Sequence, residues 1–312
     1  HGSVLGIGNL KQIALANKLC AQYVLDSIST GMVIAFAMEC YENGIIASED
    51  VDGLELNFGN EEAAIKLIDM IARREGIGDL LAEGVKRAAE KLGNGADQYA
   101  MHVKGQELPM HEPRGKRTLA LAYSTSATGA DHMEAPHDPF FESFDPQGTG
   151  AMSAMGFIEP VDRLDMGPKK VKAYYYAQLV WGLYDTVGMC DFVGEPINAL
   201  PLGKLVDCVE AVTGWPVSLW ELIKVSERAN NLKRVFNVRE GFGPADDCLP
   251  ERMFQPLENG ALEGVAIDRE EFARMLELYY DMAGWDRKSG FPSPAKLAEL
   301  DLEWLEEERP AG

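Results

Sequence analysis

The sequence predicts a mostly α-helical protein. Apolar residues recur three or four positions apart through most of the 312 residues, which is the spacing of a buried helix face. We find no regular alternation of strands and helices, and no glycine-rich phosphate motif between a strand and a helix. The hydrophobic fraction of 46% can build a substantial core, and the length allows one large or two ordinary domains.

The first third of the chain shows the helical spacing most clearly. Residues 10–41 follow it, with a break at residues 26–31, so we expect two helices to meet there. Asn60 is a predicted N-cap, because an asparagine followed by Glu61 and Glu62 suits the positive end of a helix. The helix that Asn60 begins is predicted to end near residue 76, and it is followed by a helix over 80–93 and a strand-like run over 99–103.

Residues 109–168 are rich in Gly, Pro, Ser, Thr and Asp, so we expect irregular structure throughout. An irregular region this long is usually functional or disordered. Three of the five histidines lie in it beside several carboxylates, which favours a function. Helices are predicted again over residues 171–184, 202–212, 218–236 and 269–283, with a loop at 241–250.

Composition excludes some partners. The formal net charge of −21 argues against a nucleic acid, which needs a concentrated basic surface. Apolar stretches stop well short of the ~20 residues that cross a bilayer, so we expect no membrane span and a cytoplasmic location. The chain starts at His1 rather than at a methionine, and its first residues resemble the interior of a domain. We therefore interpret it as the C-terminal piece of a longer protein.

The five cysteines are widely spaced and contain no Cys-x-x-Cys pair, which makes a disulfide framework improbable. Cys20, Cys40 and Cys208 fall in apolar helical patterns, so we predict buried, inert thiols. Cys190 and Cys248 lie instead at the ends of segments.

Two segments contain residue types that support chemistry. His132 and His137 lie among carboxylates in a glycine-bounded loop, where a histidine can be a general acid or base, a metal ligand, or a surface residue. Their spacing of five does not repeat the His-x-x-x-His pattern of zinc proteases. Arg114 belongs to a basic cluster at residues 111–117, which suits either an anionic cofactor tail or a solvated turn.

The segment Asp185-Thr186-Val187-Gly188-Met189-Cys190 joins a carboxylate, a glycine and a thiol at a predicted helix end. Such a carboxylate can hold a polar cofactor, and the cysteine can bind a soft metal as its thiolate. The other interpretation is that Asp185 and Gly188 simply end the helix, with Cys190 packed behind them. One cysteine cannot complete a metal site alone.

The segment at 185–190 resembles the Asp-x-x-Gly-Leu-Cys motif of the tungsten-dependent aldehyde ferredoxin oxidoreductase family. Other stretches resemble that family in the family's order, so that the likeness covers nearly the whole chain. They are residues 26–31, 74–84, 129–132, 211–215, 227–228, 237–242 and 279–286.

The resemblance implies two largely helical domains, over residues 1–135 and 136–312, without the family's N-terminal β domain. It also implies a bis-pterin cofactor holding tungsten or molybdenum, and a [4Fe-4S] cluster. Cys190 would be the fourth cluster ligand, because the family's Cys-x-x-Cys-x-x-x-Cys motif would lie upstream of His1. His132 would be the catalytic proton carrier, with His137 as its rival. The implied cofactor-binding residues are Asp185, Gly188, Met189, Asp26 and Arg114.

The sequence departs from the family pattern at three positions. The family's first motif copy, Asp-x-x-Gly-Leu-Asp, aligns with residues 21–26, where Ala21 replaces the aspartate and Val24 replaces the glycine. Glu134 stands where aldehyde-oxidising members tend to have a basic residue. These changes predict an altered pterin contact or a different substrate.

Three functions remain open at this stage. The first is oxidation of an aldehyde to a carboxylic acid, with ferredoxin or another iron-sulfur carrier as electron acceptor. The second is reduction of an aromatic acyl-CoA, as in the tungsten subunit of class II benzoyl-CoA reductases, which resemble this family. The third is a helical or electron-transfer subunit without catalysis. A homodimer or a subunit of a larger complex is the expected assembly.

Overall fold

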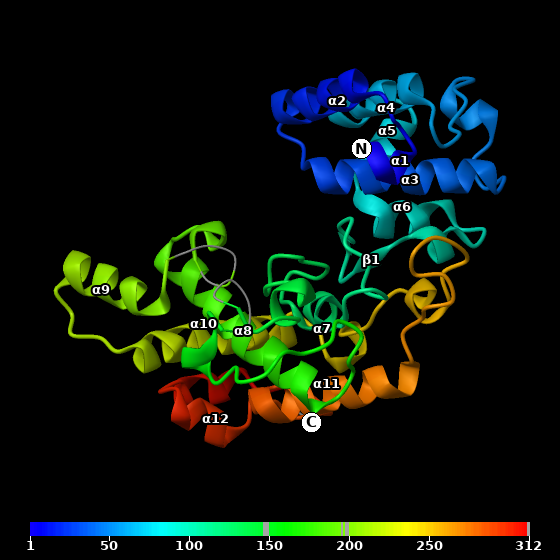
Figure 1. Ribbon diagram of the computed structural model, residues 1–312. Coiled ribbons are helices and arrows are strands. Elements are labelled where there is room, and N and C mark those ends of the chain that lie inside the picture. The colour runs from blue at the N-terminus through cyan, green and yellow to red at the C-terminus, as the bar shows by residue number, and fades with distance from the viewer. Residues whose placement is uncertain (146–149, 195, 197–199, 311–312) are drawn as a thin grey trace. The chain divides into compact units, whose positions relative to one another are not determined.

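The computed structural model describes residues 1–145, 150–194, 196 and 200–310 (Figure 1). Contacts between these residues divide the chain into two compact units. Unit 1 comprises residues 1–111, 128–131 and 249–252, and unit 2 comprises residues 112–127, 132–248 and 253–312. The predicted mostly helical fold is confirmed. The domain boundary expected after residue 135 stays a prediction.

In unit 1 the helices α2, α3 and α4 begin with a side chain that caps their first backbone N–H groups. Asn60 caps α4, as predicted, by accepting a hydrogen bond from the Ala63 amide at 3.1 Å. The helices of this unit are α1 (Gly2–Leu5), α2 (Leu10–Tyr23), α3 (Ser27–Glu42), α4 (Glu61–Arg73), α5 (Ile77–Leu81) and α6 (Gly84–Leu92), with 3₁₀ turns at Ser48–Val51 and Ala96–Tyr99.

The helices of unit 1 enclose one apolar core. α3 is its centre, since Val33 to Met38 are all buried there, and α2 and α4 pack against each other (Figure 1). The single helix predicted over 80–93 is wrong at its start, because α5 and α6 are separate helices. The buried carboxylate of Glu107 accepts the Val85 amide at 2.9 Å and so caps α6 from a distant part of the chain.

A two-residue hairpin supplies that glutamate. β1 (His102–Val103) pairs antiparallel with β2 (Gln106–Glu107). The strand-like run predicted over 99–103 is therefore confirmed only at its last two residues, and residues 96–99 form a 3₁₀ turn instead.

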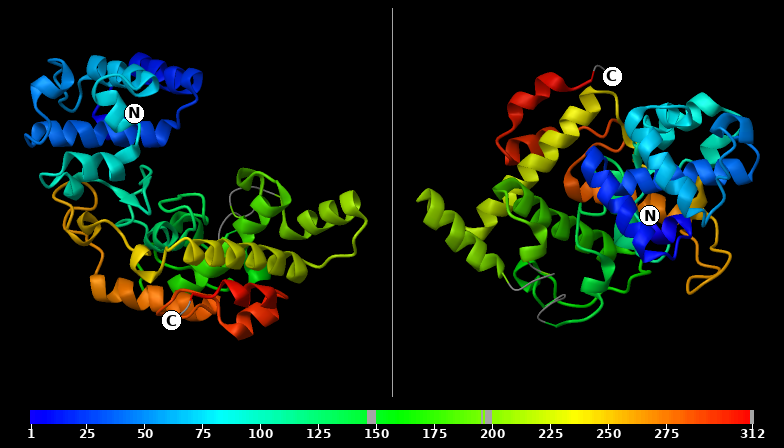
Figure 2. Two further views of the ribbon diagram at one scale, coloured as in Figure 1. Left: turned by 180° about the vertical axis from the view of Figure 1, so that it is seen from behind. Right: turned by 90° about the horizontal axis from the view of Figure 1, so that it is seen from above.

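Unit 2 is organised around one long buried helix. α8 packs against α7, α10 and α11, and most of its residues are buried (Figure 2). The helices of this unit are α7 (Arg117–Thr125), α8 (Pro168–Val187), α9 (Leu202–Thr213), α10 (Leu219–Arg239), α11 (Arg269–Ala283) and α12 (Pro294–Glu299). Its 3₁₀ turns are Asp138–Phe141, Ser153–Met155, Asp191–Val193, Pro244–Asp246 and Glu303–Glu308, and the turn Glu251–Phe254 spans both units.

α7 corrects the prediction of irregular structure throughout residues 109–168. All nine of its residues are buried. This helix is only nine residues long and begins without a side-chain N-cap, so it offers neither a capped start nor a long apolar repeat, the two signals by which other helices were predicted. Residues 146–149 of the same region lie outside the described part of the chain.

No single helix among the described residues is long and apolar enough to cross a membrane. The pair α2 and α3 meets the length and composition criteria only when taken together, with a bend of 116° between them.

Candidate functional site

The predicted motif at residues 185–190 forms the exposed C-terminal end of α8. Gly188 adopts a left-handed conformation, with φ 73° and ψ 32°, and ends the helix. The Met189 amide then donates to the Tyr184 carbonyl at 2.8 Å, closing the turn. Asp185 and Cys190 are exposed on either side of this turn. The interpretation in which Cys190 packs behind the helix end is therefore wrong.

The degraded first motif at residues 21–26 has the same backbone geometry at the end of α2. Val24 is left-handed, with φ 58° and ψ 40°, and the Leu25 amide donates to the Cys20 carbonyl at 2.9 Å. Ala21 and Asp26 are exposed, and the Asp26 carboxylate accepts the Ser29 amide at 2.7 Å as the N-cap of α3. The two motif copies are thus matching helix ends, of which unit 1 holds one and unit 2 the other.

The thiols separate into buried and exposed groups. Cys20 and Cys40 are buried as predicted, and burial raises the pKa of both, that of Cys40 to about 12. The prediction for Cys208 is wrong, because α9 buries only Leu202 and Leu205 and leaves this thiol exposed. Among the described residues, no group of three or more His, Cys, Asp or Glu side chains is arranged to hold a metal.

The two loop histidines lie close together, with ring centroids 6.1 Å apart. His137 is held on both ring nitrogens: Nε2 lies 2.9 Å from the His132 carbonyl oxygen, and Nδ1 lies 3.3 Å from Lys116 Nζ. Burial, and the neighbouring charge of Lys116, lower the pKa of His137 to about 4. His137 is therefore neutral at pH 7, with the tautomer protonated on Nε2 satisfying both contacts.

A buried ion pair attaches this loop to α8. Asp138 and Lys170 are both fully buried and form a direct salt bridge. Asp138 also accepts the Thr118 amide, at 3.0 Å to one carboxylate oxygen, and the Thr118 hydroxyl at 2.9 Å. The carboxylate thus joins the loop to the first turns of both α7 and α8. Removing one member of a buried pair leaves an uncompensated charge, so the pair holds the loop in a defined position.

Glu134 belongs to a second polar chain inside unit 2. Its carboxylate accepts the Gln178 amide Nε2 at 2.6 Å, and the Tyr279 hydroxyl donates to Gln178 Oε1 at 2.7 Å. Tyr174, whose ring lies 5.2 Å from that of Tyr279, shares a hydrogen bond of 2.7 Å with the Thr125 hydroxyl. Burial raises the pKa of both tyrosines, so both remain protonated donors at neutral pH.

Arg114 is buried and already engaged by protein groups. Its guanidinium makes two hydrogen bonds of 2.9 Å to the Glu112 carboxylate, and it donates to the Gln255 carbonyl at 3.0 Å. An anionic ligand would have to compete with the bidentate pair. Cofactor binding by Arg114 stays a prediction.

Sequence reasoning missed Lys170, Gln178 and Tyr279, which support the loop from α8 and α11. Lys170 and Gln178 lie within a strongly apolar helix, at positions that are fully or almost fully buried. Buried polar side chains require partners, so the lysine and the glutamine in this helix were the sequence signal for a supporting contact. The partners themselves lie 32 and 44 residues away in the sequence and could not be chosen without the fold.

One helix end presents an exposed carboxylate and an exposed thiol, which are groups that can hold a polar or metal-containing cofactor, and a matching helix end lies in the second unit. Residues 1–302 match the family model described as aldehyde ferredoxin oxidoreductase, domains 2 and 3. The chain belongs to this family.

Known relatives agree with the assignment. A tungsten-containing aldehyde ferredoxin oxidoreductase of Pyrococcus horikoshii is 36% identical over 307 residues, which cover 97% of this chain and 47% of the relative. The WOR-like subunit of an aliphatic sulfonate oxidoreductase of Pyrococcus furiosus is 32% identical over 314 residues, covering 96% and 44%. The chain therefore spans about half the length of the curated relatives it matches.

A solved structure has the same fold. The active-site complex BamBC of benzoyl coenzyme A reductase, with 1,5-dienoyl-CoA, superimposes with a TM-score of 0.73 over 96% of this chain and 48% of that one. The sequence identity is 24%, so this likeness concerns the fold.

Proposed function

We propose that the chain is the C-terminal portion of a tungsten bis-pterin oxidoreductase that oxidises aldehydes to carboxylic acids and passes the electrons to ferredoxin. The observation that carries the proposal is the end of α8, where an exposed carboxylate, a left-handed glycine and an exposed thiol follow one another. The relatives that match almost the whole chain include tungsten-containing aldehyde ferredoxin oxidoreductases at 36% and 34% identity.

The residues present fit such a cofactor. Cys190 is a soft donor that is accessible in this chain, so a cluster can reach it, while Cys20 and Cys40 are buried. In this proposal Cys190 binds the [4Fe-4S] cluster together with thiolates from outside this chain. Asp185 accepts hydrogen bonds from a pterin edge beside Gly188 and Met189, and Asp26 lies at the corresponding helix end of unit 1. When bound, the metal and its pterins supply the oxygen and electron chemistry.

The protein has to supply a proton carrier, and we assign this role to His132. Its rival His137 has a pKa lowered to about 4 and has both ring nitrogens in contact with protein groups. A side chain that stays neutral down to that pH is poorly matched to proton transfer near pH 7. His137 fits better as the residue that orients the loop, through its contact with the His132 carbonyl oxygen.

Benzoyl-CoA reduction is the weaker alternative. Its support is the fold of a complex whose sequence identity to this chain is 24%, whereas the aldehyde enzymes reach 36%. Glu134 is engaged by Gln178 inside unit 2, so its negative charge has an internal partner and does not by itself indicate an acyl-CoA substrate.

The test uses the full-length protein produced with tungstate. Cys190→Ala should lose the iron of one cluster and its absorbance, because the fourth thiolate is missing. Cys208→Ala is the matched control, since its thiol is also exposed but lies on α9, and it should keep wild-type iron content. Unchanged iron in Cys190→Ala, with the protein folded, would refute the assignment. Oxidation of aldehydes with ferredoxin as acceptor is then measured on the wild type.

A further inference from the structure

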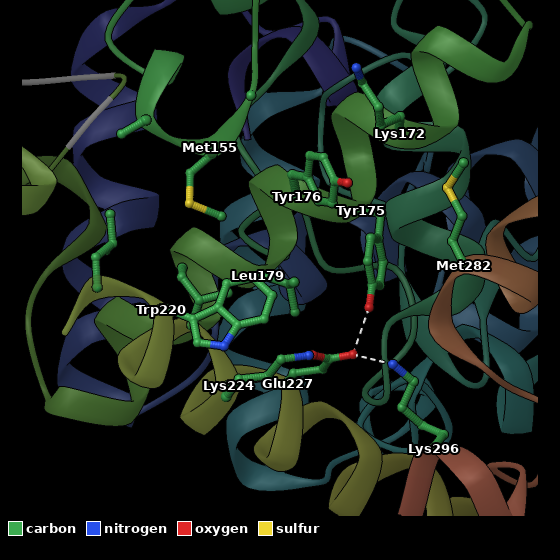
Figure 3. Close-up of a pocket in the computed structure, with 14 residues that line it drawn as sticks. Met155, Lys172, Tyr175, Tyr176, Leu179, Trp220, Lys224, Glu227, Met282 and Lys296 are labelled. Atoms are coloured by element: carbon green, nitrogen blue, oxygen red, sulfur yellow. Dashed lines mark hydrogen bonds and ion pairs between the residues drawn. The ribbon is translucent and has the colours of Figure 1, made fainter. Parts of the chain in front are cut away.

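Unit 2 contains a cavity of about 700 Å³ between α8, α10 and α12, which the proposed chemistry does not use (Figure 3). This volume lies within the range of sites that take drug-sized molecules. Trp220 and Met155 line one side of the space in Figure 3, and Met282 and Lys296 line the opposite side. The cavity thus has apolar walls with a few charged side chains.

Three charged side chains of the lining are neutralised together with Glu299, which lies outside the lining. The buried carboxylate of Glu227 accepts hydrogen bonds from Lys296 at 2.6 Å, from Lys224 at 2.7 Å and from the Tyr175 hydroxyl at 2.8 Å. Glu299 binds the same two lysines and closes the ring. Burial alone would raise the pKa of Glu227, but the two lysines outweigh it and hold that pKa below its ordinary value. The ring therefore has no net charge at neutral pH.

Lys172 is the remaining cation among the described residues that line the cavity. It lies on α8, is half-buried, and has no hydrogen-bond or ion-pair partner among the residues that the structure describes. In contrast, its neighbour Lys169 pairs with Glu159 at 2.9 Å on the exposed side. A half-buried ammonium without a protein partner gains most from an anion that enters the cavity. Once Glu299 is counted beside the lining, one positive charge remains unbalanced.

We propose that this cavity is a second binding site that takes an organic monocarboxylate. The carboxylate pairs with Lys172, and an aliphatic or aromatic body packs against Trp220, Leu179 and Met155. A single unbalanced positive charge matches one negative charge and disfavours a polyphosphate. The apolar walls distinguish an organic acid from an inorganic anion. The site goes beyond the proposed oxidation, although its ligand belongs to the chemical class of that reaction's product.

Calorimetric titration of the full-length protein with hexanoate and with benzoate tests the proposal. Both acids should bind with Kd below about 1 mM. Hexanamide, which has the same body without the charge, should bind at least about tenfold more weakly, because a charged hydrogen bond is lost. Lys172→Gln should weaken hexanoate to the same degree. Lys169→Gln is the matched control and should bind as the wild type does.

The outcomes separate this site from the proposed catalytic one. His132→Asn should leave hexanoate binding unchanged, and binding should be the same in protein produced without tungstate. Equal binding of acid and amide, no effect of Lys172→Gln, or no heat at millimolar acid would each overturn the second site while leaving aldehyde oxidation standing. Loss of hexanoate binding in His132→Asn would instead assign the acid to the catalytic loop and also overturn the proposal.

Discussion

Val24 has a left-handed backbone conformation, which predicts that a glycine substitution has the opposite of its usual destabilising effect. The end of α2 requires a positive φ, and Val24 supplies it with a β-branched side chain at φ 58°. For residues other than glycine this conformation costs about 1–2 kcal/mol. We therefore expect Val24→Gly to stabilise the protein.

The net effect follows from the surroundings of the side chain. Val24 is 91% exposed, so its removal sacrifices almost no apolar burial. Glycine costs about 0.5–1 kcal/mol more in backbone entropy on folding. The difference leaves a gain of about 0.5–1 kcal/mol in the free energy of unfolding, which raises the melting temperature by about 1–4 °C in a protein of this size.

The assay is thermal unfolding followed by circular dichroism, with hydrogen exchange of the α2 amides as a local measurement. Val187→Gly is the comparison at the other helix end. Val187 is the last residue of α8, so glycine there should cost up to about 1 kcal/mol and lower the midpoint. If Val24→Gly lowers the midpoint as Val187→Gly does, the backbone of α2 is not strained at this position and the reasoning fails.

Three further predictions concern the loop of unit 2. Lys170→Met should lower the free energy of unfolding in urea by about 3–5 kcal/mol, because Asp138 is left buried without its counter-ion. The control Lys169→Met should change that free energy by less than about 1 kcal/mol, because its ion pair is exposed. The pKa of His137 is about 6.5 in the unfolded chain and about 4 in the folded protein, so the thermal unfolding midpoint should decline as the pH falls from 6.5 toward 4. His137→Asn should make that decline less steep. An equally steep decline in the variant would contradict the prediction. His132→Asn should keep the metal and lower turnover by about 100- to 10,000-fold in steady-state kinetics, and wild-type turnover would remove its role.

Much of the helical architecture could be predicted from local signals. Asn60 and the two glutamates after it predicted the start of α4, and the apolar spacing of residues 10–41 predicted both α2 and α3. These signals work because a cap and an amphipathic face are encoded within a few residues. α7 was not predicted because it is short and has no side-chain N-cap. The separate start of α6 was not predicted because its cap, Glu107, comes from the hairpin.

The candidate site was also predictable only in part. The helix end at Asp185 to Cys190 could be predicted as a segment, since its glycine and its motif are contiguous. The contacts that support the loop could not be predicted. Asp138 meets Lys170, and Glu134 meets Gln178, only after the fold brings them together. Exposure also could not be foreseen for Cys208, whose apolar neighbour Val212 is 86% exposed.

The buried ion pair at the start of α8 and the motif at its end are held at a fixed distance and rotation by this one helix. Lys170 fixes the loop near the N-terminus, and Cys190 follows the C-terminus at Val187. The seventeen steps along the helix from Lys170 to Val187, at ~1.5 Å each, set about 25 Å between these ends. Inserting one residue between them would turn one end by about 100° relative to the other, so that Asp185 and Cys190 would change direction relative to the loop. Changes in the length of α8 should therefore be far less acceptable than changes in its side chains.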